Sequence, residues 1–550
     1  MYHSAVLVLS ITISMNTIMK KLFPVLLGLI YSAITFSQND AVDTTIISRI
    51  KAEAYTHSQV MDHAFYITDY SGPRLTWSSG YDRAAEWTLN EFKKWGLQNI
   101  HKEEWQPLGK SWNIERCYVA LKNPYYQNIA ATPKAWSGST NGLVIAEVML
   151  VSAKDSMDFV KKYTGKLKGK ILIFESKFPA PEISFNPNAK RFTADSLAKL
   201  EAETDPGSQT LFEEDTAAMN KKFQSLLQMF ATYFMSDKLW TFCKKEGAVG
   251  ILSMGGGSDG TYSADGSYNF APKAGLLPIA NVNIRPDDYL RITRLLDHKV
   301  PVKMELDIKT TSKPQPQKGY NLVAEIPGND PVLKNELVVI GGHFDSWHGG
   351  TGATDNGAGS IVMMEVMRIL KKLNLDMKRT IRIVLWGGEE QGLFGSLAYV
   401  NKNVAELATM KPLRDYDRIS AYYNLDNGSG RIRGIHLQGN NELRPIFKQW
   451  LAPFKDLDAT TVSIKKSGYT DNEPFDIAGI PAFQFIQDEL NYESRTHHTN
   501  ADTYDELSEE DLKQASTIIA SLVYNTANRK EKLPRKPKPN PYGNFNFHIL

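Results

Sequence analysis

Cysteine is nearly absent from this sequence, which narrows the kinds of protein it can be. Only Cys117 and Cys243 occur among 550 residues, too few for a disulfide-stabilised scaffold or for a zinc motif built from several thiolates. A single bridge between the two is compatible with an exported protein, but their separation in sequence does not decide whether it forms. Any metal site in this chain is expected to use oxygen and nitrogen ligands.

An excess of charge of one sign is also missing. The 63 basic and 61 acidic residues leave a formal net charge of +2. No basic stripe interleaved with aromatic residues occurs, so nucleic acid is not an expected partner. After the N-terminal region, no segment approaches the ~20 consecutive apolar residues of a membrane-spanning helix. The mature protein is therefore not expected to span a membrane.

The N-terminal region contains one apolar run. It starts at Met19 with "MKKLFPVLLGLIYSAITFSQND", in which two lysines precede the apolar stretch and small residues end it, so cleavage near Ser37–Gln38 fits an export signal. A membrane anchor is the alternative, but the run is short for a span. We expect residues 1–37 to be a cleaved signal peptide and the protein to be secreted or periplasmic. Residues 1–18 precede the pattern and fit a start codon placed too early, so the true start stays open.

The chain is longer than one hydrophobic core usually supports, so two domains are expected. Short strands between Gly-rich turns, such as "GKILIFES" and "GAVGILSM", predict a smaller β-rich domain. Residues 180–243 within it are interpreted as an insertion that forms a lid or part of a dimer contact. The oligomeric state stays open, with a homodimer as one alternative. The expected organisation is a main domain in two parts (38–114 and 312–530), an inserted β-rich domain (115–311) and a Pro/Lys-rich tail (531–550).

From Tyr320 onward, runs of β-branched and aromatic residues alternate with amphipathic helices. This alternation is typical of an α/β layered domain with a largely parallel sheet. Nearer the N-terminus, apolar residues at roughly helical spacing predict a helix over residues 84–95, and Gly96 follows where a cap belongs. Residues 309–320, "KTTSKPQPQKGY", are predicted to be a linker.

Polar residues follow the predicted strands of the α/β domain. In chain order they are His343, Asp345, Asp355, Glu389, Glu390, Asp426, His497 and His498. Taken singly, each is interpreted as an ordinary loop residue or, for Asp355, as a helix cap. Because the loops at the carboxyl ends of strands converge on one crevice in open α/β sheets, their joint occurrence predicts a ligand site.

Three carboxylates and two imidazoles of this set are oxygen and nitrogen donors that suit a divalent metal such as zinc. Three acids in one crevice would repel one another unless a metal or protons neutralised them. The charges of Asp355, Glu390 and Asp426, two zinc ions and one bridging hydroxide sum to zero, as a partly buried site requires. We therefore expect two zinc ions per chain.

Several motifs, in this order, resemble those of the co-catalytic zinc exopeptidases: "GGHFDSWHGGTGATDNGAGS", "WGGEEQGLFGS", "NLDNGSG" and "HHTNADT". This family includes bacterial leucyl aminopeptidase and glutamate carboxypeptidase II, and the sequence resembles its carboxypeptidase Q type most. The resemblance covers nearly the whole mature chain. It implies an α/β fold in which a three-layer zinc-exopeptidase domain with a mixed, largely parallel central sheet is interrupted by a β-rich protease-associated domain.

The resemblance also implies a role for each matching residue. The implied zinc ligands are His343, Asp355, Glu390, Asp426 and His498, with Asp355 shared between the two ions. His498 rather than His497 matches the ligand, because it directly precedes the stretch Thr499 to Thr503 of the family pattern. Glu389 falls on the general base, which takes a proton from the attacking water and returns it to the leaving amine. Asp345 is expected to accept the second N–H of the His343 imidazole.

Departures from the family pattern concern the surroundings of the site. His348 stands where carboxypeptidase Q has an acid, and Asn472 stands where other relatives have a histidine. Tyr469, Asp471 and His348 are candidates for contacts with the substrate. A structural role in their loops is the alternative for each of them.

The resulting prediction is an exported di-zinc metallo-exopeptidase that hydrolyses short peptides or dipeptides as a dipeptidase or carboxypeptidase. An aminopeptidase of the same family is the alternative, and cleavage that survives N-acetylation would argue against it. A non-catalytic receptor-like homologue and a glutaminyl cyclase are disfavoured, the first by the intact ligand positions and the second by the inserted β-rich domain. The preferred side chains and the recognised peptide terminus stay open.

Overall fold

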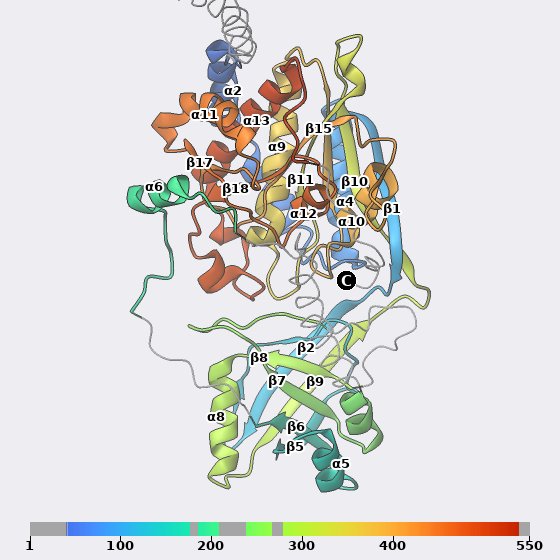
Figure 1. Cartoon of the computed structure of the whole chain (residues 1–550). Helices are drawn as coiled ribbons and strands as arrows, with labels where there is room; N and C mark the ends of the chain where they lie inside the picture. Colours follow the sequence, from blue (N-terminus) through green and yellow to red (C-terminus); the bar gives the residue numbers. More distant parts are fainter. Residues whose placement is uncertain (1–39, 41, 176–184, 208–237, 267–278, 538–550) are drawn as a thin grey trace, which may run out of the picture. The chain divides into compact units, whose positions relative to one another are not determined.

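The computed structural model describes residues 40, 42–175, 185–207, 238–266 and 279–537 (Figure 1). The chain separates into the units Met1–Val42 and Asp43–Leu550, and every strand of the described residues belongs to the second. The predicted signal peptide, much of the predicted insertion and the end of the tail lie outside the described residues. In the described part of the chain, no helix has both the length and the apolar composition that spanning a membrane requires.

Eight strands form the first sheet, and most of them come from the second half of the sequence. β12, β11, β15 and β18 run parallel, whereas β1 and β10 are antiparallel additions at one edge. The prediction of an α/β fold with a mixed central sheet is therefore confirmed. The order is β1 (Gln98–Gly109), β10 (Gln317–Ile326), β12 (Thr380–Trp386), β11 (Leu337–His343), β15 (Ile419–Asn424), β18 (Ala482–Gln487), β16 (Ile432–His436) and β17 (Thr461–Ser463).

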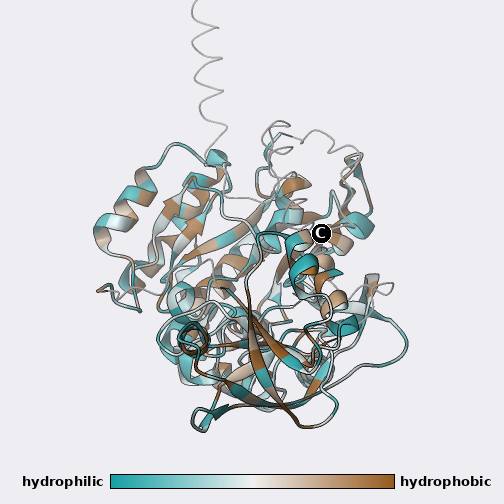
Figure 2. Cartoon of the chain, turned by 90° about the horizontal axis from the view of Figure 1, so that it is seen from below, coloured by the Kyte–Doolittle hydropathy of each residue, from teal (hydrophilic) through white to brown (hydrophobic). Residues whose placement is uncertain are grey.

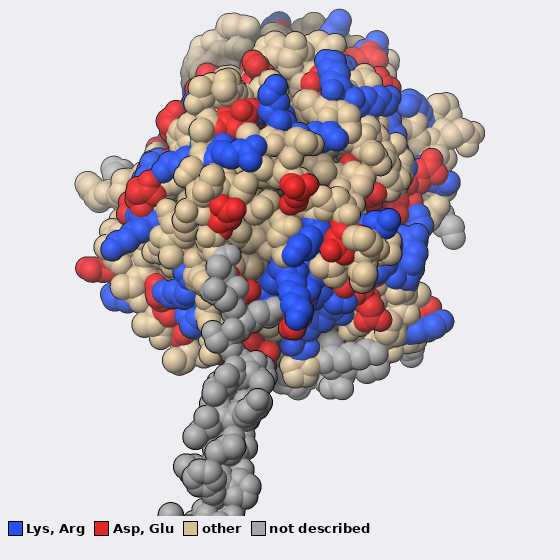
Figure 3. All heavy atoms as spheres, turned by 90° about the horizontal axis from the view of Figure 1, so that it is seen from above, with Lys and Arg blue, Asp and Glu red and all other residues tan. Residues whose placement is uncertain are grey.

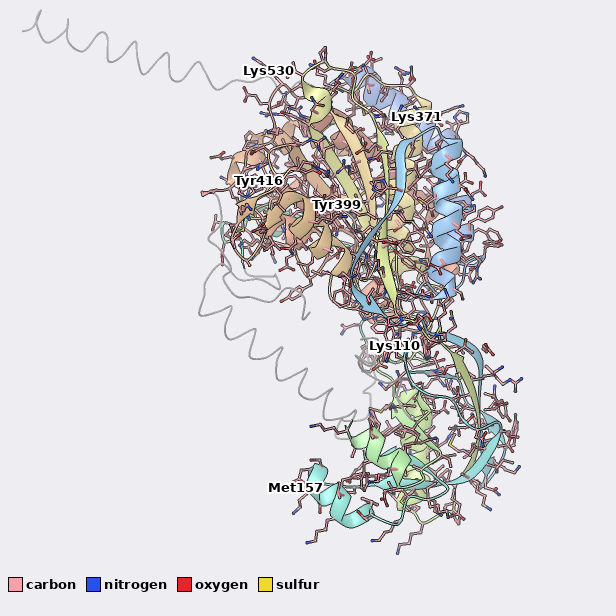
Figure 4. The ribbon with its side chains drawn as sticks, turned by 90° about the vertical axis from the view of Figure 1, so that its right-hand side faces the viewer. Lys110, Met157, Lys371, Tyr399, Tyr416 and Lys530 are labelled. Atoms are coloured by element: carbon pink, nitrogen blue, oxygen red, sulfur yellow. The ribbon has the colours of Figure 1, made fainter. Side chains whose placement is uncertain are left out.

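Helices pack on both faces of this sheet. A Cβ at Gly342 would meet Leu425 and Gly359 at the start of α9, whereas a Cβ at the preceding Gly341 would meet Trp386 and Tyr422, since successive residues of a strand face opposite sides. Figure 4 shows Tyr399 of α10 on the other side of the sheet from the blue helix α4. The helices of this part are α2 (Thr44–Thr56), α3 (Val60–Ile67), α4 (Ser79–Lys94), α9 (Ala358–Lys372), α10 (Phe394–Tyr399), α11 (Arg444–Leu451), α12 (Asn472–Ile477) and α13 (Glu509–Asn528).

Local signals in the sequence account for α4. The Ser78 hydroxyl accepts the N–H of Tyr81 at 3.2 Å and so caps the first turn. Trp95 is the C-cap residue, and Gly96 follows at a φ of 70° that favours glycine. The helix predicted over residues 84–95 is confirmed, although it begins earlier, at Ser79.

The linker predicted over residues 309–320 is wrong at both ends. β9 continues to Thr311, and β10 already begins at Gln317. These polar residues lack the alternation of a strand, but their backbones pair with β2 and β1. Pairing with strands distant in sequence, rather than local propensity, makes them strands.

A second sheet of eight strands is formed between residues 113 and 311. Its central strands β5, β6, β7 and β8 are parallel, and the helices α5 (Ser156–Tyr163) and α8 (Pro286–Asp297) accompany them. Figure 2 shows brown, hydrophobic residues along strands and teal residues in connecting loops. The order is β3 (Gln127–Asn128), β2 (Asn113–Asn123), β9 (Lys303–Thr311), β5 (Val144–Val151), β6 (Lys170–Phe174), β7 (Gly250–Met254), β8 (Asn281–Ile284) and β4 (Ala131–Pro133).

The two cysteines are not joined. Cys117 lies in β2, where its thiol is 3.4 Å from the carbonyl oxygen of Ala131, and Cys243 is buried against other apolar side chains. Burial raises the pKa of each thiol to about 12, so neither is a reactive thiolate at neutral pH. On the face seen in Figure 3, acidic and basic side chains are interspersed, in keeping with the near-zero net charge.

Candidate metal centre

Predicted site residues lie at the carboxyl ends of three neighbouring parallel strands of the first sheet, β12, β11 and β15. His343, the last residue of β11, pairs with Trp386 at the end of β12. On the other side of β11, Gly341 pairs with Asn424 at the end of β15. The acids that follow β12 and β15 therefore emerge beside the His343 imidazole, at the edge where ligands bind in such sheets.

Asp355 lies between two imidazoles. Its Oδ1 is 3.2 Å from Nε2 of His343, and its Oδ2 is 3.2 Å from Nε2 of His498. Asp426 Oδ1 approaches the same His343 nitrogen at 3.3 Å, while Glu390 Oε2 approaches the His498 nitrogen at 3.0 Å. We call His343 with Asp426 the strand half and Glu390 with His498 the loop half. The structure thus brings all five predicted ligands together, with Asp355 between the halves.

Glu389 and Glu390 are adjacent in sequence but point to different halves. Glu389 Oε2 lies 4.0 Å from His343 Nε2, whereas Glu390 Oε2 contacts His498. Both backbone N–H groups donate to the carboxylate of Asp345, at 3.2 Å from Glu389 and 3.4 Å from Glu390. The Asp345 carboxylate therefore holds the turn that separates the two glutamates.

That arrangement corrects the expected role of Asp345. The His343 Nδ1 lies 3.0 Å from the backbone carbonyl oxygen of Asp345, which can only accept, while the carboxylate is 3.8 Å away. The carboxylate is engaged instead by the turn after β12 and by the Thr76 hydroxyl at 2.8 Å. Asp345 still orients the imidazole, but through its backbone.

His498 lies in an irregular loop, at a φ of 58° that non-glycine residues rarely adopt. Residues 262–264, which connect β7 to β8 of the second sheet, pair with this loop. The Ala264 N–H donates to the His498 carbonyl at 2.8 Å, and the Asn500 N–H donates to the Tyr262 carbonyl at 3.1 Å. The Tyr262 N–H in turn donates to Asn500 Oδ1 at 2.8 Å. A segment far away in sequence therefore braces this ligand.

Burial and pairing set the protonation of these groups. Burial opposes charge on His343, but the nearby carboxylates, Asp426 first, outweigh it and raise its pKa well above the usual value. The same balance raises the pKa of His498. Burial raises the pKa of Glu389 well above its ordinary value. Burial would also raise the pKa of Asp355, but its two imidazole partners hold it well below the usual value. The acids thus attract positive charge to this point, and Glu389 is suited to hold a proton.

The donor set fits a metal ion. Asp355 Oδ2 and Asp426 Oδ1 are buried without a well-aligned hydrogen-bond donor among the described residues. Buried acceptors in that state are costly, and a cation would satisfy them. Two groups of side chains could each hold a metal ion, because the ligand atoms within each group lie within 4.8 Å of one another. One group is Asp355, His497 and His498, and the other is His343, Asp355 and Glu390.

The candidate substrate contacts differ in their surroundings. His348 is 6% exposed, and its Nε2 lies 2.7 Å from the carbonyl oxygen of Pro133 in β4, so this ring is tied to the second sheet. Asp471 is completely buried, and burial raises its pKa to about 8. The His343 and Asp426 side chains act on that pKa, which places Asp471 near the strand half. Tyr469 is 54% exposed.

The sequence does not single out two buried residues that support the centre. Asp502 accepts the backbone N–H of Thr354 at 2.6 Å and that of Asp355 at 3.2 Å. Arg74 donates to four backbone carbonyl oxygens around the site, at 2.7 to 3.3 Å. Burial lowers the pKa of Arg74 to about 10 and raises that of Asp502 to about 7. The motif "HHTNADT" contains Asp502, whereas the partners of Arg74 are backbone atoms, three of them far away along the chain, and cannot be inferred from local pattern.

Comparison with known proteins identifies relatives of the catalytic part. Residues 321–523 match Peptidase family M28. Carboxypeptidase Q of Mus musculus is 24% identical over 470 residues, which cover 85% of this chain and 86% of that protein. Aminopeptidase YwaD of Bacillus subtilis is 30% identical over 209 residues, which cover 37% of this chain and 44% of that protein.

Solved structures share the fold. A peptidase M28 precursor from Shewanella amazonensis SB2B has a TM-score of 0.61 at 23% identity, and the match covers 90% of this chain and 99% of that chain. The zinc aminopeptidase BSAP from Bacillus subtilis has a TM-score of 0.52 at 19% identity, and the match covers 88% and 97%. The family resemblance inferred from the motifs is confirmed for residues 321–523, which match Peptidase family M28.

Proposed function

We propose that this protein is an exported zinc-dependent exopeptidase that hydrolyses short peptides or dipeptides. The observation that carries the proposal is the position of Asp355, whose two oxygens each lie 3.2 Å from a different imidazole, with Glu389 beside the same cluster. A carboxylate shared in this way suits two cations held next to each other, and a free glutamate next to them suits a general base.

The residues at the centre would hold two zinc ions. His343 and Asp426 would bind one, Glu390 and His498 the other, and Asp355 both. The mixture of imidazole and carboxylate donors suits zinc. Zinc bound there would supply Lewis-acid chemistry and lower the pKa of bound water to about 7.

Side chains of the protein itself would carry out the proton transfer. Glu389 would accept a proton from the attacking water and pass it to the leaving amine, a role that its position beside the cluster, 4.0 Å from His343 Nε2, supports. The hydrogen bonds from the Glu389 and Glu390 N–H groups to Asp345 would keep the base and the ligand apart. Asp502, through the backbone of Asp355, would hold the shared carboxylate in place.

The choice between peptide termini rests on the relatives. In sequence, carboxypeptidase Q of Mus musculus matches over 85% of this chain, whereas aminopeptidase YwaD matches over 37%. We therefore favour dipeptidase or carboxypeptidase activity, with aminopeptidase activity as the alternative. Peptides blocked separately at the two ends decide between them, since cleavage of N-acetylated peptides contradicts the aminopeptidase.

The organisation predicted from the sequence completes the proposal. Residues 1–37 would be removed on export to the periplasm or the medium, and residues 38–114 and 312–530 would form the peptidase domain. Residues 115–311 would be an inserted protease-associated domain, and residues 531–550 a surface tail. Mass spectrometry of the exported protein tests this directly, because the mature chain should begin at Gln38.

The test of the function itself is metal analysis together with hydrolysis of free dipeptides. We expect about two zinc ions per chain, hydrolysis that stops after chelation, and recovery when zinc returns. A purified protein with no bound metal would point to the non-catalytic, receptor-like alternative.

A further inference from the structure

A segment that follows β6 of the second sheet packs against strands and loops of the first. Residues 188–207, which we call the docked segment, contain α6 (Ala194–Ala202). Lys190 and Leu490 bridge through their backbones, each N–H donating to the other carbonyl at 2.8 Å. Arg191 pairs at 2.8 Å with Asp488, whose side chain is fully buried. The segment is therefore anchored to the loop that leads from β18 to His498.

The other end of the docked segment is anchored as well. The Ser463 hydroxyl of β17 donates to the carbonyl oxygen of Leu200 at 2.9 Å, and the Lys466 N–H donates to that of Pro206 at 2.8 Å. Figure 1 accordingly shows α6 beside β17. Because both ends are bonded to the first sheet and its loops, α6 occupies a defined position.

A cavity of about 460 Å³ lies between the docked segment and β18. It lies next to the metal centre, since its walls include Asn427 and Tyr492, and the ring of His497 that Tyr492 contacts is 3.9 Å from the ring of His498. The Tyr492 ring is 4.8 Å from the ring of His497, the neighbour of a proposed ligand. The docked segment contributes the wall residues Phe192, Ser196 and Leu200.

The walls of this pocket combine apolar residues with polar and charged ones. Phe485 and Ile486 of β18 contribute to the walls together with Phe192 and Leu200, and the polar residues His436, Gln487, Glu489 and Glu493 line the pocket as well. Two charged residues of the docked segment also line the pocket and are exposed. They are Lys199 and Glu203, the C-cap residue of α6. Enclosing an apolar side chain in such a space is favourable, whereas a charged side chain would have to leave water.

We propose that the docked segment is a specificity element, with α6 setting the size of the apolar substrate side chain that is accepted beside the metal centre. The proposal rests on the proposed peptidase function and adds that residues from between two strands of the second sheet shape the site. Ser196 faces the pocket and Ala198, two positions later on α6, is exposed. The helix therefore offers a matched pair of positions at which the same bulky residue either fills the pocket or projects into solvent.

The test compares Ser196→Trp with Ala198→Trp in the zinc-loaded protein on dipeptides that carry Ala, Leu or Phe at either position. We expect Ser196→Trp to lower kcat/KM about 10-fold or more for the Phe substrate at one position, since apolar pockets discriminate by ~10–200-fold. The Ala–Ala substrate should change less than about twofold. Ala198→Trp should match the wild type throughout. A uniform loss across all substrates, or no loss for Phe, would overturn the role of α6.

A binding measurement keeps this result separate from the peptidase function. In a Glu389→Gln background, calorimetry should show weaker binding of the Phe dipeptide, relative to the Ala dipeptide, when Ser196→Trp is added. If the wild type cleaves no peptide but this binding preference shifts, the peptidase function fails and the pocket stands. If peptides are cleaved, and Ser196→Trp leaves the binding preference unchanged, the peptidase function stands and only the proposed role of the pocket is contradicted.

Discussion

The two histidines of the candidate centre are held in different ways. His343 is the last residue of β11, is 1% exposed and has neighbouring parallel strands on both sides. His498 lies in an irregular loop at a φ of 58°, its side chain is 39% exposed, and residues 262–264 brace its backbone. The sheet thus fixes His343, whereas long-range pairing with the connection between β7 and β8 fixes His498.

The positions of the two histidines therefore depend on different parts of the structure. A ligand at the end of a central strand moves only with the sheet, but a ligand in a braced loop depends on the hydrogen bonds that hold the loop. A left-handed conformation at a non-glycine residue costs about 1–3 kcal/mol and persists only where the surroundings enforce it. The loop half is therefore the half whose geometry depends on residues outside the motifs.

The largest effect is expected from Glu389→Gln, which removes the proposed base and no ligand. Hydrolysis of free dipeptides should fall ~10² or more, because general base catalysis contributes about 10²–10⁴. Zinc content should not change in either half. Glu406→Gln, at an exposed ion pair with Lys411, is the matched control and should retain activity. Unchanged hydrolysis by Glu389→Gln would remove Glu389 from its role.

Removing the imidazoles one at a time tests the comparison itself. His343→Ala leaves buried acids without their partner and should destabilise the metal-free protein by about 3 kcal/mol. His498→Ala should cost about 1 kcal/mol or less, because that side chain is partly exposed. Urea unfolding measures both values, and His298→Ala on the exposed end of α8 controls for loss of a histidine. Equal losses would mean that the two halves are equally buried in solution.

Acid should strip metal from both halves. Neighbouring carboxylates raise the pKa of His343 and His498 well above the usual value, although burial opposes this. A raised pKa means that protons compete with the metal already near neutral pH, so metal affinity should fall as the pH is lowered. Each protonated imidazole contributes about tenfold per pH unit. Zinc retention measured after dialysis from pH 8 to pH 5 checks the direction, and retention that improves in acid would contradict it.

The sequence predicted the ligand residues of the strand half better than the contacts that hold those residues in place. His343 and Asp426 follow runs of β-branched or aromatic residues, so their common edge can be inferred from local pattern and the geometry of parallel sheets. The acceptor for His343 could not be inferred, because it depends on which oxygen of Asp345 the turn after β12 already occupies. The strand at Gln317 was likewise hidden, since pairing with β1 and not its own composition forms it.

Asn500→Ala should give the smallest effect and should act on the loop half alone. The substitution removes the acceptor of the Tyr262 N–H and with it one of the bonds that brace the His498 loop. Loss of a group that orients a ligand typically costs 10–100-fold in metal affinity, and because the backbone bonds remain we expect about 10-fold for one zinc ion. Asn500→Asp keeps an acceptor oxygen in the same place and should restore tight binding. Zinc titration with a competing chelator resolves the two ions, and a loss shared equally by both would mean that the brace supports the whole edge of the sheet and not the loop ligand.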